Sequence, residues 1–315
     1  MRRRPALLCA AVAAVAVLAG CGGGGQATAP ATGGSAHPSV PPTQGSITGV
    51  PVRTVSTTDG AVSYRETGTG PPLLLIMGFG GTMDAWDPTF VDALAATHRV
   101  ITFDNAGVGR TSPLPGPLTI TAMAEQTAAF VRALHLTHVD VLGWSMGGMI
   151  AQALTVTHPD LVGHLVLAAT LPGNGHATLP SAAVTAKLAS VATDPAALLS
   201  LLFPPGATDA EHSYVAAIAT YPDFSTPTPA VLAQQGQALA SWATGQEPAG
   251  QRIGTIRAPT FVADGTDDQL VPPANSTTLA HTIPGARLQL YDQAAHAFLF
   301  QDEAAFVPAV TSFLG

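Results

Sequence analysis

Apolar residues along most of the chain follow two alternating patterns, which together predict a sheet of mainly parallel strands covered by helices. Helical spacing of apolar residues is clearest at 85–94, 120–134 and 146–154. A continuous apolar run at 73–77 is typical of a buried central strand, and further strands are predicted at 98–103, 139–142, 165–167 and 259–263. Before them, alternation from Val50 to Tyr64 around Asp59-Gly60 predicts an antiparallel hairpin that opens the folded domain.

Residues 171–254 break this rhythm. They are rich in proline and show helical apolar patterns at 184–202, 212–221 and 230–243, with no convincing strand. The strand pattern resumes at residue 259, which favours a helical cap inserted into one domain over a separate helical domain. The remaining part predicts a helix at 275–282, a strand at 286–291 and a last helix at 303–313. The predicted fold class is therefore α/β, with a doubly wound, mostly parallel sheet spanning residues 50–315 and a cap at about 171–254.

The N-terminus has the pattern of an export signal. Basic residues Arg2 to Arg4 precede a short apolar run, so residues 1–20 are predicted to be a signal peptide. The run ends in Leu-Ala-Gly-Cys21, which resembles the lipobox of bacterial lipoproteins and implies cleavage before Cys21 and lipidation of its thiol. The alternative is an ordinary secretory signal with an incidental cysteine. Residues 21–49, rich in Gly, Pro, Ser and Thr, are predicted to form a flexible tether on the outer face of the cell membrane.

Composition then narrows the classes of partner. The formal charge is −8, and removing residues 1–20 takes away three arginines and no acids, which gives −11. Nucleic acid is an unsuitable partner for such an acidic body. The chain has two cysteines, Cys9 and Cys21, so the mature protein can form no internal disulfide. The histidines, His37 in the tether included, show no metal-binding spacing, so no metal is expected.

The strongest chemical signal is Gly143-Trp144-Ser145-Met146-Gly147, a G-x-S-x-G pattern between a predicted strand and a predicted helix. The glycines permit a sharp turn that exposes the serine oxygen, and the helix N-terminus favours a developing negative charge. A chance match in a chain rich in alanine and glycine is the alternative. The strand before the motif and the helix after it favour Ser145 as a nucleophile.

Two more loops complete a predicted site. The strand at 73–77 runs into Gly78-Phe79-Gly80-Gly81, where bare backbone could supply half of an oxyanion hole. Asp268 and His296 each follow a predicted strand, so a parallel sheet would bring both to the edge that carries Ser145. The glycines at 107–109 do not form a dinucleotide fingerprint, because no third glycine opens a helix there.

With GWSMGG, GTDDQLVP and AAHAF in this order, residues 50–315 resemble the α/β-hydrolase superfamily. The resemblance implies a triad of Ser145, Asp268 and His296, and an oxyanion hole made by the backbone amides of Phe79 and Met146. It also implies a reaction without a cofactor. Two side chains that brace loops in this family are replaced, since Met77 stands in place of its histidine and Ala106 in place of its arginine.

Three functions fit these features. The favoured one is a lipid-anchored serine hydrolase that cleaves small or medium carboxylic esters through an acyl-enzyme. A cofactor-free haloperoxidase or perhydrolase of the same superfamily is the second. The third is a non-catalytic surface binding protein on the same fold. The cap sequence names no substrate, and the oligomeric state is open.

Overall fold

The computed structural model describes residues 45–191, 194, 196–222 and 224–315. The expected signal peptide, Cys21 and most of the expected tether lie outside the described residues. No helix in the described ranges is long and apolar enough to cross a membrane.

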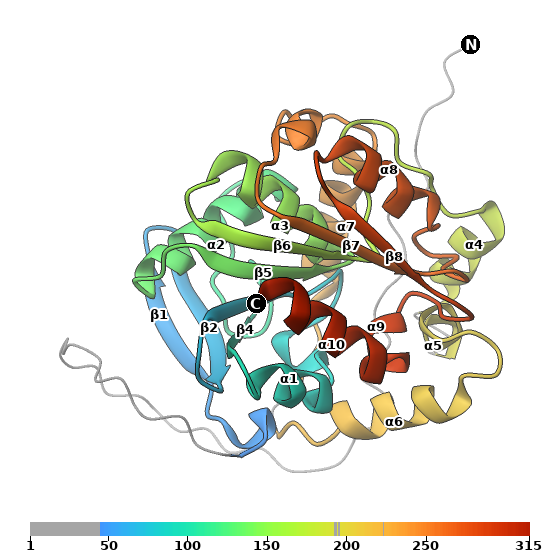
Figure 1. The fold of residues 1–315 in the computed structure, drawn as a ribbon, viewed down its shortest axis with the longest axis horizontal. Helices are drawn as coiled ribbons and strands as arrows, with labels where there is room; N and C mark the ends of the chain where they lie inside the picture. The colour runs from blue at the N-terminus through green and yellow to red at the C-terminus, as the bar shows by residue number, and fades with distance from the viewer. Residues whose placement is uncertain (1–44, 192–193, 195, 223) are drawn as a thin grey trace.

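One twisted sheet of eight strands organises the described residues (Figure 1). Its order is β1-β2-β4-β3-β5-β6-β7-β8. The strands are β1 (Arg53–Thr57), β2 (Gly60–Thr67), β3 (Pro72–Ile76), β4 (Arg99–Phe103), β5 (Val139–Trp144), β6 (Val162–Ala168), β7 (Thr260–Gly265) and β8 (Arg287–Tyr291). The β1–β2 and β2–β4 pairs are antiparallel, and the pairs from β4 to β8 are parallel. The predicted hairpin and the mostly parallel sheet are confirmed.

Helices cover both faces of this sheet, as expected of a doubly wound fold. Those outside the cap are α1 (Pro88–Ala95), α2 (Ile120–Ala133), α3 (Met146–Thr157), α8 (Ala274–Thr282), α9 (Phe298–Gln301) and α10 (Glu303–Leu314), with short 3₁₀ turns η1 (Ile47–Gly49) and η2 (Met83–Ala85). Alternate strand residues supply two cores, because successive side chains point to opposite faces. Leu74 packs with the α2 and α3 side, and its neighbour Leu75 with the α1 and α10 side.

Local sequence explains where these helices begin. The Thr119 hydroxyl accepts a hydrogen bond of 2.9 Å from the Ala122 N–H and so caps α2. Asp87 caps α1 in the same way, and proline occupies the first turn, where no amide hydrogen is needed. These caps satisfy amides that a helix itself leaves unpaired.

The segment between β6 and β7 forms the cap and contains α4 (Ala182–Ser190), α5 (Ala196–Leu202), α6 (Thr208–Ile218), α7 (Pro229–Ala243) and the 3₁₀ helix η3 (Gly250–Thr255). No strand occurs in its described residues. The single apolar pattern predicted at 184–202 is two helices rather than one. Pro195 stands between the two helices in the sequence, and a proline disfavours helical backbone at the residue before it.

The C-terminal half of the cap is tied to the main body. Trp242 on α7 is fully buried in the core that includes residues of α2 and α3, and its ring N–H donates at 3.3 Å to the carbonyl of Leu171, shortly after β6. The buried carboxylate of Glu247 accepts hydrogen bonds from the Ile120 N–H at 3.0 Å and the Thr121 N–H at 2.8 Å. It therefore holds the N-terminus of α2, where the helix dipole favours an anion.

The N-terminal boundary of the folded domain differs from the expected one. The sequence predicts a tether up to residue 49, but Ile47 is fully buried, and its N–H donates to the Asp92 carboxylate at 2.8 Å. The buried side chain of Arg65 also donates to the Val50 carbonyl. A single isoleucine in a polar stretch gives no periodicity to read, so the sequence alone does not reveal this docking.

Candidate active site

Ser145 lies at the turn between β5 and α3, at the carboxyl edge of the sheet. Its φ of 57° and ψ of −122° put it in a backbone conformation that residues other than glycine rarely adopt. The turn is crowded: a Cβ at Gly143 would lie 2.4 Å from the Gly147 carbonyl oxygen. A Cβ at Gly147 would lie 1.9 Å from the Ile76 carbonyl oxygen. Both glycines of the motif are therefore needed for β5, α3 and β3 to meet at Ser145.

Hydrogen bonds to its main chain hold Ser145 in this position. Its N–H donates to the Ala168 carbonyl at 2.9 Å, and its own carbonyl accepts from the Thr170 hydroxyl at 2.6 Å. The side chain is only partly buried. The surrounding structure thus fixes the strained turn and leaves the hydroxyl accessible, as a nucleophile requires.

Asp268 and His296 meet in the structure. Asp268 lies in the β7–α8 loop and His296 in the β8–α9 loop; both are almost fully buried, and His296 Nδ1 is 2.7 Å from Asp268 Oδ2. A carboxylate only accepts, so Nδ1 carries the proton and Nε2 is free to act as a base. The other carboxylate oxygen accepts from the N–H groups of Leu270 and Val271, each at 2.8 Å.

A link through Trp144 places this pair beside the nucleophile turn. The indole N–H of Trp144 donates to the His296 carbonyl at 3.0 Å, and the two rings lie 5.6 Å apart. Among the described residues, no hydrogen bond joins the Ser145 hydroxyl to His296. In enzymes without bound substrate, catalytic hydrogen bonds are often long.

The predicted oxyanion amides belong to residues close to Ser145. Gly78, next to Phe79, approaches Ser145 so closely that a Cβ there would lie 3.1 Å from the Ser145 Cβ. Met146 is the first residue of α3. Within the described ranges, neither the Phe79 nor the Met146 N–H donates a hydrogen bond, so both amides can donate to a developing oxyanion.

The loop at residues 78–81, here called the oxyanion loop, is held by residues that the sequence does not predict. The buried side-chain amide of Asn105 donates to the Met77 carbonyl at 2.9 Å. From the cap, the buried Gln235 accepts from the Gly80 N–H at 3.0 Å. These contacts support the loop although Met77 and Ala106 replace the side chains that usually do so.

Asp104 braces the segment that follows the oxyanion loop, because its carboxylate accepts from the Met83 N–H at 2.8 Å. Burial raises the pKa of Asp104 to about 6. It borders a cavity of about 280 Å³ together with Asp84, which pairs with Arg65 at 3.1 Å.

In the part of the chain that the structure describes, no group of three or more His, Cys, Asp or Glu side chains could hold a metal ion.

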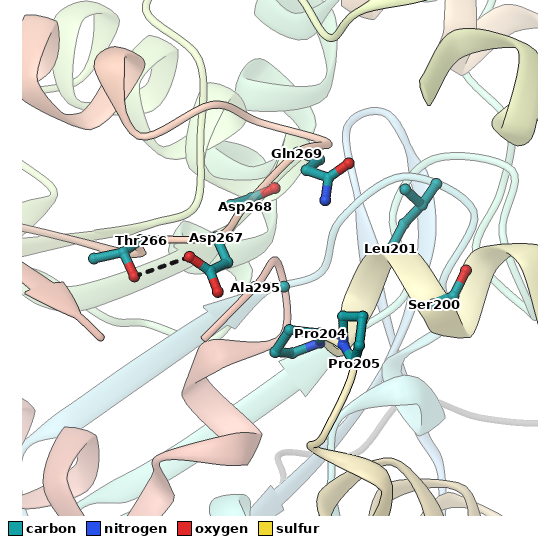
Figure 2. Close-up of a pocket in the computed structure, with 9 residues that line it drawn as sticks. All are labelled: Ser200, Leu201, Pro204, Pro205, Thr266, Asp267, Asp268, Gln269 and Ala295. Carbon is teal, nitrogen blue, oxygen red and sulfur yellow. Dashed lines mark hydrogen bonds between the residues drawn. The ribbon is translucent and has the colours of Figure 1, made fainter. Parts of the chain in front are cut away.

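A second cavity, of about 240 Å³, lies between the end of α5 and the β7–α8 loop (Figure 2). Its lining includes Asp267, Asp268 and Ala295 from the main body, and Pro204 and Pro205 from the cap. Ser145 does not line it. The cavity therefore borders the acid–base pair rather than the nucleophile, at the boundary between the cap and the sheet edge.

Comparisons with known proteins agree with the fold. A family model described as "alpha/beta hydrolase fold" matches residues 71–303. The chain is 32% identical over 273 residues to a protein of Azorhizobium caulinodans provisionally named carbamate hydrolase RutD, covering 82% of this chain and 96% of that protein. It is 30% identical over 256 residues to the poly(3-hydroxyalkanoate) depolymerase of Ectopseudomonas oleovorans, covering 77% and 84%.

A third relative has a solved structure. It is a protein of Mycobacterium tuberculosis H37Rv, provisionally named non-heme bromoperoxidase BpoC, with 33% identity over 262 residues that cover 80% of this chain and 97% of that protein. Its crystal structure superimposes with a TM-score of 0.64 at 30% identity, covering 80% of this chain and 94% of that chain.

Proposed function

The chain belongs to the alpha/beta hydrolase fold family, and from this we propose that it is a serine hydrolase that cleaves small or medium carboxylic esters through an acyl-enzyme on Ser145. The observation that carries the proposal is the buried His296–Asp268 hydrogen bond of 2.7 Å beside a strained, accessible serine. A base fixed by a carboxylate next to such a serine is the arrangement that activates a hydroxyl for acyl transfer.

The residues divide the reaction as follows. His296 Nε2 takes the proton of the Ser145 hydroxyl while the oxygen attacks the ester carbonyl carbon, and the carbonyl electrons move to its oxygen. The Phe79 and Met146 amides stabilise that oxyanion, and His296 then passes its proton to the leaving alcohol. Water, activated by His296, attacks the acyl-enzyme and releases the acid. Asp268 holds the imidazole and stabilises its charged form.

Two relatives support hydrolysis at a carbonyl carbon, since their names describe a carbamate hydrolase and a depolymerase of a polyester. The similarity to BpoC favours a second candidate, a cofactor-free haloperoxidase or perhydrolase, because hydrogen peroxide could replace water in attacking the acyl-enzyme. We rank ester hydrolysis first because no residue of the chain marks a dedicated peroxide or acid site.

We expect a fluorophosphonate probe to label the purified protein on the peptide that contains Ser145. Nitrophenyl esters of graded acyl length should be hydrolysed with the highest kcat/KM at short or medium chain length. A higher kcat/KM for peroxide-dependent halogenation than for any ester would establish the second candidate instead. Absence of both labelling and turnover in a folded protein would indicate the third candidate, a non-catalytic binding protein.

We further propose that the enzyme is anchored to the outer face of a bacterial membrane by lipid on Cys21. The proposal rests on the basic residues Arg2 to Arg4, the short apolar run and the Leu-Ala-Gly-Cys sequence. Because the body is acidic, acyl chains rather than a basic patch would supply the affinity for the membrane.

In cells, replacing Cys21 by serine should move the protein from the membrane fraction to the soluble fraction. Immunoblots of fractionated cells measure this, and Cys9→Ser, which changes the other cysteine, is the matched control that should stay in the membrane fraction. Retention of the Cys21→Ser protein at the membrane would contradict lipid anchoring.

A further inference from the structure

Asp264 is a buried carboxyl group for which the proposed reaction has no use. It lies in β7, four residues before Asp268, and is fully buried. The Ser276 hydroxyl on α8 donates to one of its oxygens at 2.6 Å, and the Gly265 N–H donates to the other at 2.9 Å. An ionised carboxylate at such a depth is costly unless a positive charge compensates it.

The charged neighbour of Asp264 is a second carboxylate rather than a cation. A hydrogen bond links the Asp264 carboxyl to that of Asp268, and burial together with the negative charge of Asp268 raises the pKa of Asp264 well above its ordinary value. Two carboxyl groups joined by a hydrogen bond share one proton, because two ionised carboxylates have no donor between them.

The surroundings decide which of the two holds this proton. Asp268 accepts three hydrogen bonds, from two backbone amides and from His296, whereas Asp264 accepts two. In the described residues, Asp268 is the ionisable side chain that acts on Asp264. Next to Asp264 itself, α8 contributes the Ser276 hydroxyl, and β8 pairs Leu290 with it. The proton therefore resides on Asp264.

We propose that Asp264 is a positioning residue that remains protonated and donates its O–H to the Asp268 carboxylate, extending the Ser145–His296–Asp268 set to four members. This inference rests on the proposed function, since it assigns a task to a neighbour of the proposed triad. The fourth member orients the Asp268 carboxylate and withdraws negative charge from it. Without this hydrogen bond, the full negative charge of Asp268 would face the imidazole of His296.

Two substitutions separate this role from simple packing. Asp264→Asn keeps an N–H donor, whereas Asp264→Leu has a similar volume and no donor. The acidic limb of the plot of kcat/KM against pH reports the base of the free enzyme. In the leucine variant, we expect the midpoint of this limb to move to higher pH by about half to one unit. We expect its kcat to fall about tenfold, as on loss of a supporting hydrogen bond to a site residue. The asparagine variant should keep the limb close to that of the wild-type protein.

An infrared measurement on the wild-type protein needs neither turnover nor a stable leucine variant. At about pH 8, where Asp104 with its pKa of about 6 is ionised, the protein should show the C=O stretch of a protonated carboxylic acid, and the band should disappear in Asp264→Asn. Asp209→Asn, which changes an exposed aspartate on α6, should leave the band unchanged. This readout distinguishes failure of the inference from failure of the proposed function, which fluorophosphonate labelling tests.

A missing acid band in the wild-type protein, or a band that survives in Asp264→Asn, would overturn the proposal. So would a folded leucine variant whose acidic limb coincides with that of the wild-type protein, or an asparagine variant that shifts as far as the leucine variant. If no ester is turned over, the pH dependence of the fluorophosphonate labelling rate replaces the kcat/KM profile.

Discussion

Replacing Ser145 by alanine is expected to lower kcat for an activated ester by about a millionfold, or about 8 kcal/mol in activation free energy. The change removes the attacking oxygen, and His296 and Asp268 then have no hydroxyl to activate. Residual turnover would come from the oxyanion amides and substrate binding alone. Because alanine is small and the serine is held through its main chain, the fold should survive, and a thermal melt checks this.

Ser63→Ala is a matched control for that measurement. Ser63 is fully buried in β2, and its hydroxyl has no hydrogen-bond partner in the described residues. The same chemical change should therefore leave kcat near the wild-type value. Retention of more than about one hundredth of the wild-type kcat by Ser145→Ala would rule out the acyl-enzyme mechanism, since a loss that small does not correspond to removal of a nucleophile.

Asp268→Asn is expected to lose about ten-thousandfold in kcat, the scale seen when an amide replaces the carboxylate of a serine–histidine–aspartate triad. Asparagine can donate to Nδ1 and so favours the wrong imidazole tautomer, and it cannot stabilise the charged imidazole. The neighbouring Asp267 is exposed, and its carboxylate contacts the Thr266 hydroxyl at 3.4 Å (Figure 2). Asp267→Asn should therefore keep most of the turnover and cost about 1 kcal/mol of stability at most.

Both purified variants are compared on one activated ester, with folding checked by thermal melt. An inactive Asp267→Asn beside an active Asp268→Asn would show that the wrong carboxylate has been assigned to His296. Equal activity of the two would show that neither carboxylate supports the base.

The pattern of apolar residues and the spacing of motifs predict the strands, the helices and the site loops that follow the strands. Residues 73–77 are uniformly apolar and Val139, Val141 and Leu142 are apolar around Asp140, because a central parallel strand is buried on both faces, and both segments are predicted as strands. Asp268 and His296 were placed from their positions after consecutive strands of the final segment. The structure brings these two into contact.

Contacts between distant segments left no such pattern. Gln235 and Gly80 are separated by 155 residues, and Glu247 and Ile120 by 127. In the sequence, Gln235 is one of several polar residues on a cap helix, and Glu247 follows the end of that helix. Asp264 likewise has no signal in sequence, because its significance comes from the fold that places it against Asp268 and Ser276.

The two halves of the cap are attached to the main body by different numbers of buried contacts. This difference determines where local unfolding requires the least free energy. Helix α7 and the residues after it are held by Gln235, Trp242 and Glu247, whereas the only buried residue of α4 is Val184. The free energy of local unfolding is low where few apolar contacts are buried. Amide hydrogens of α4 therefore exchange with solvent through small openings that leave the sheet intact, whereas those around Trp242 exchange only when the main core unfolds.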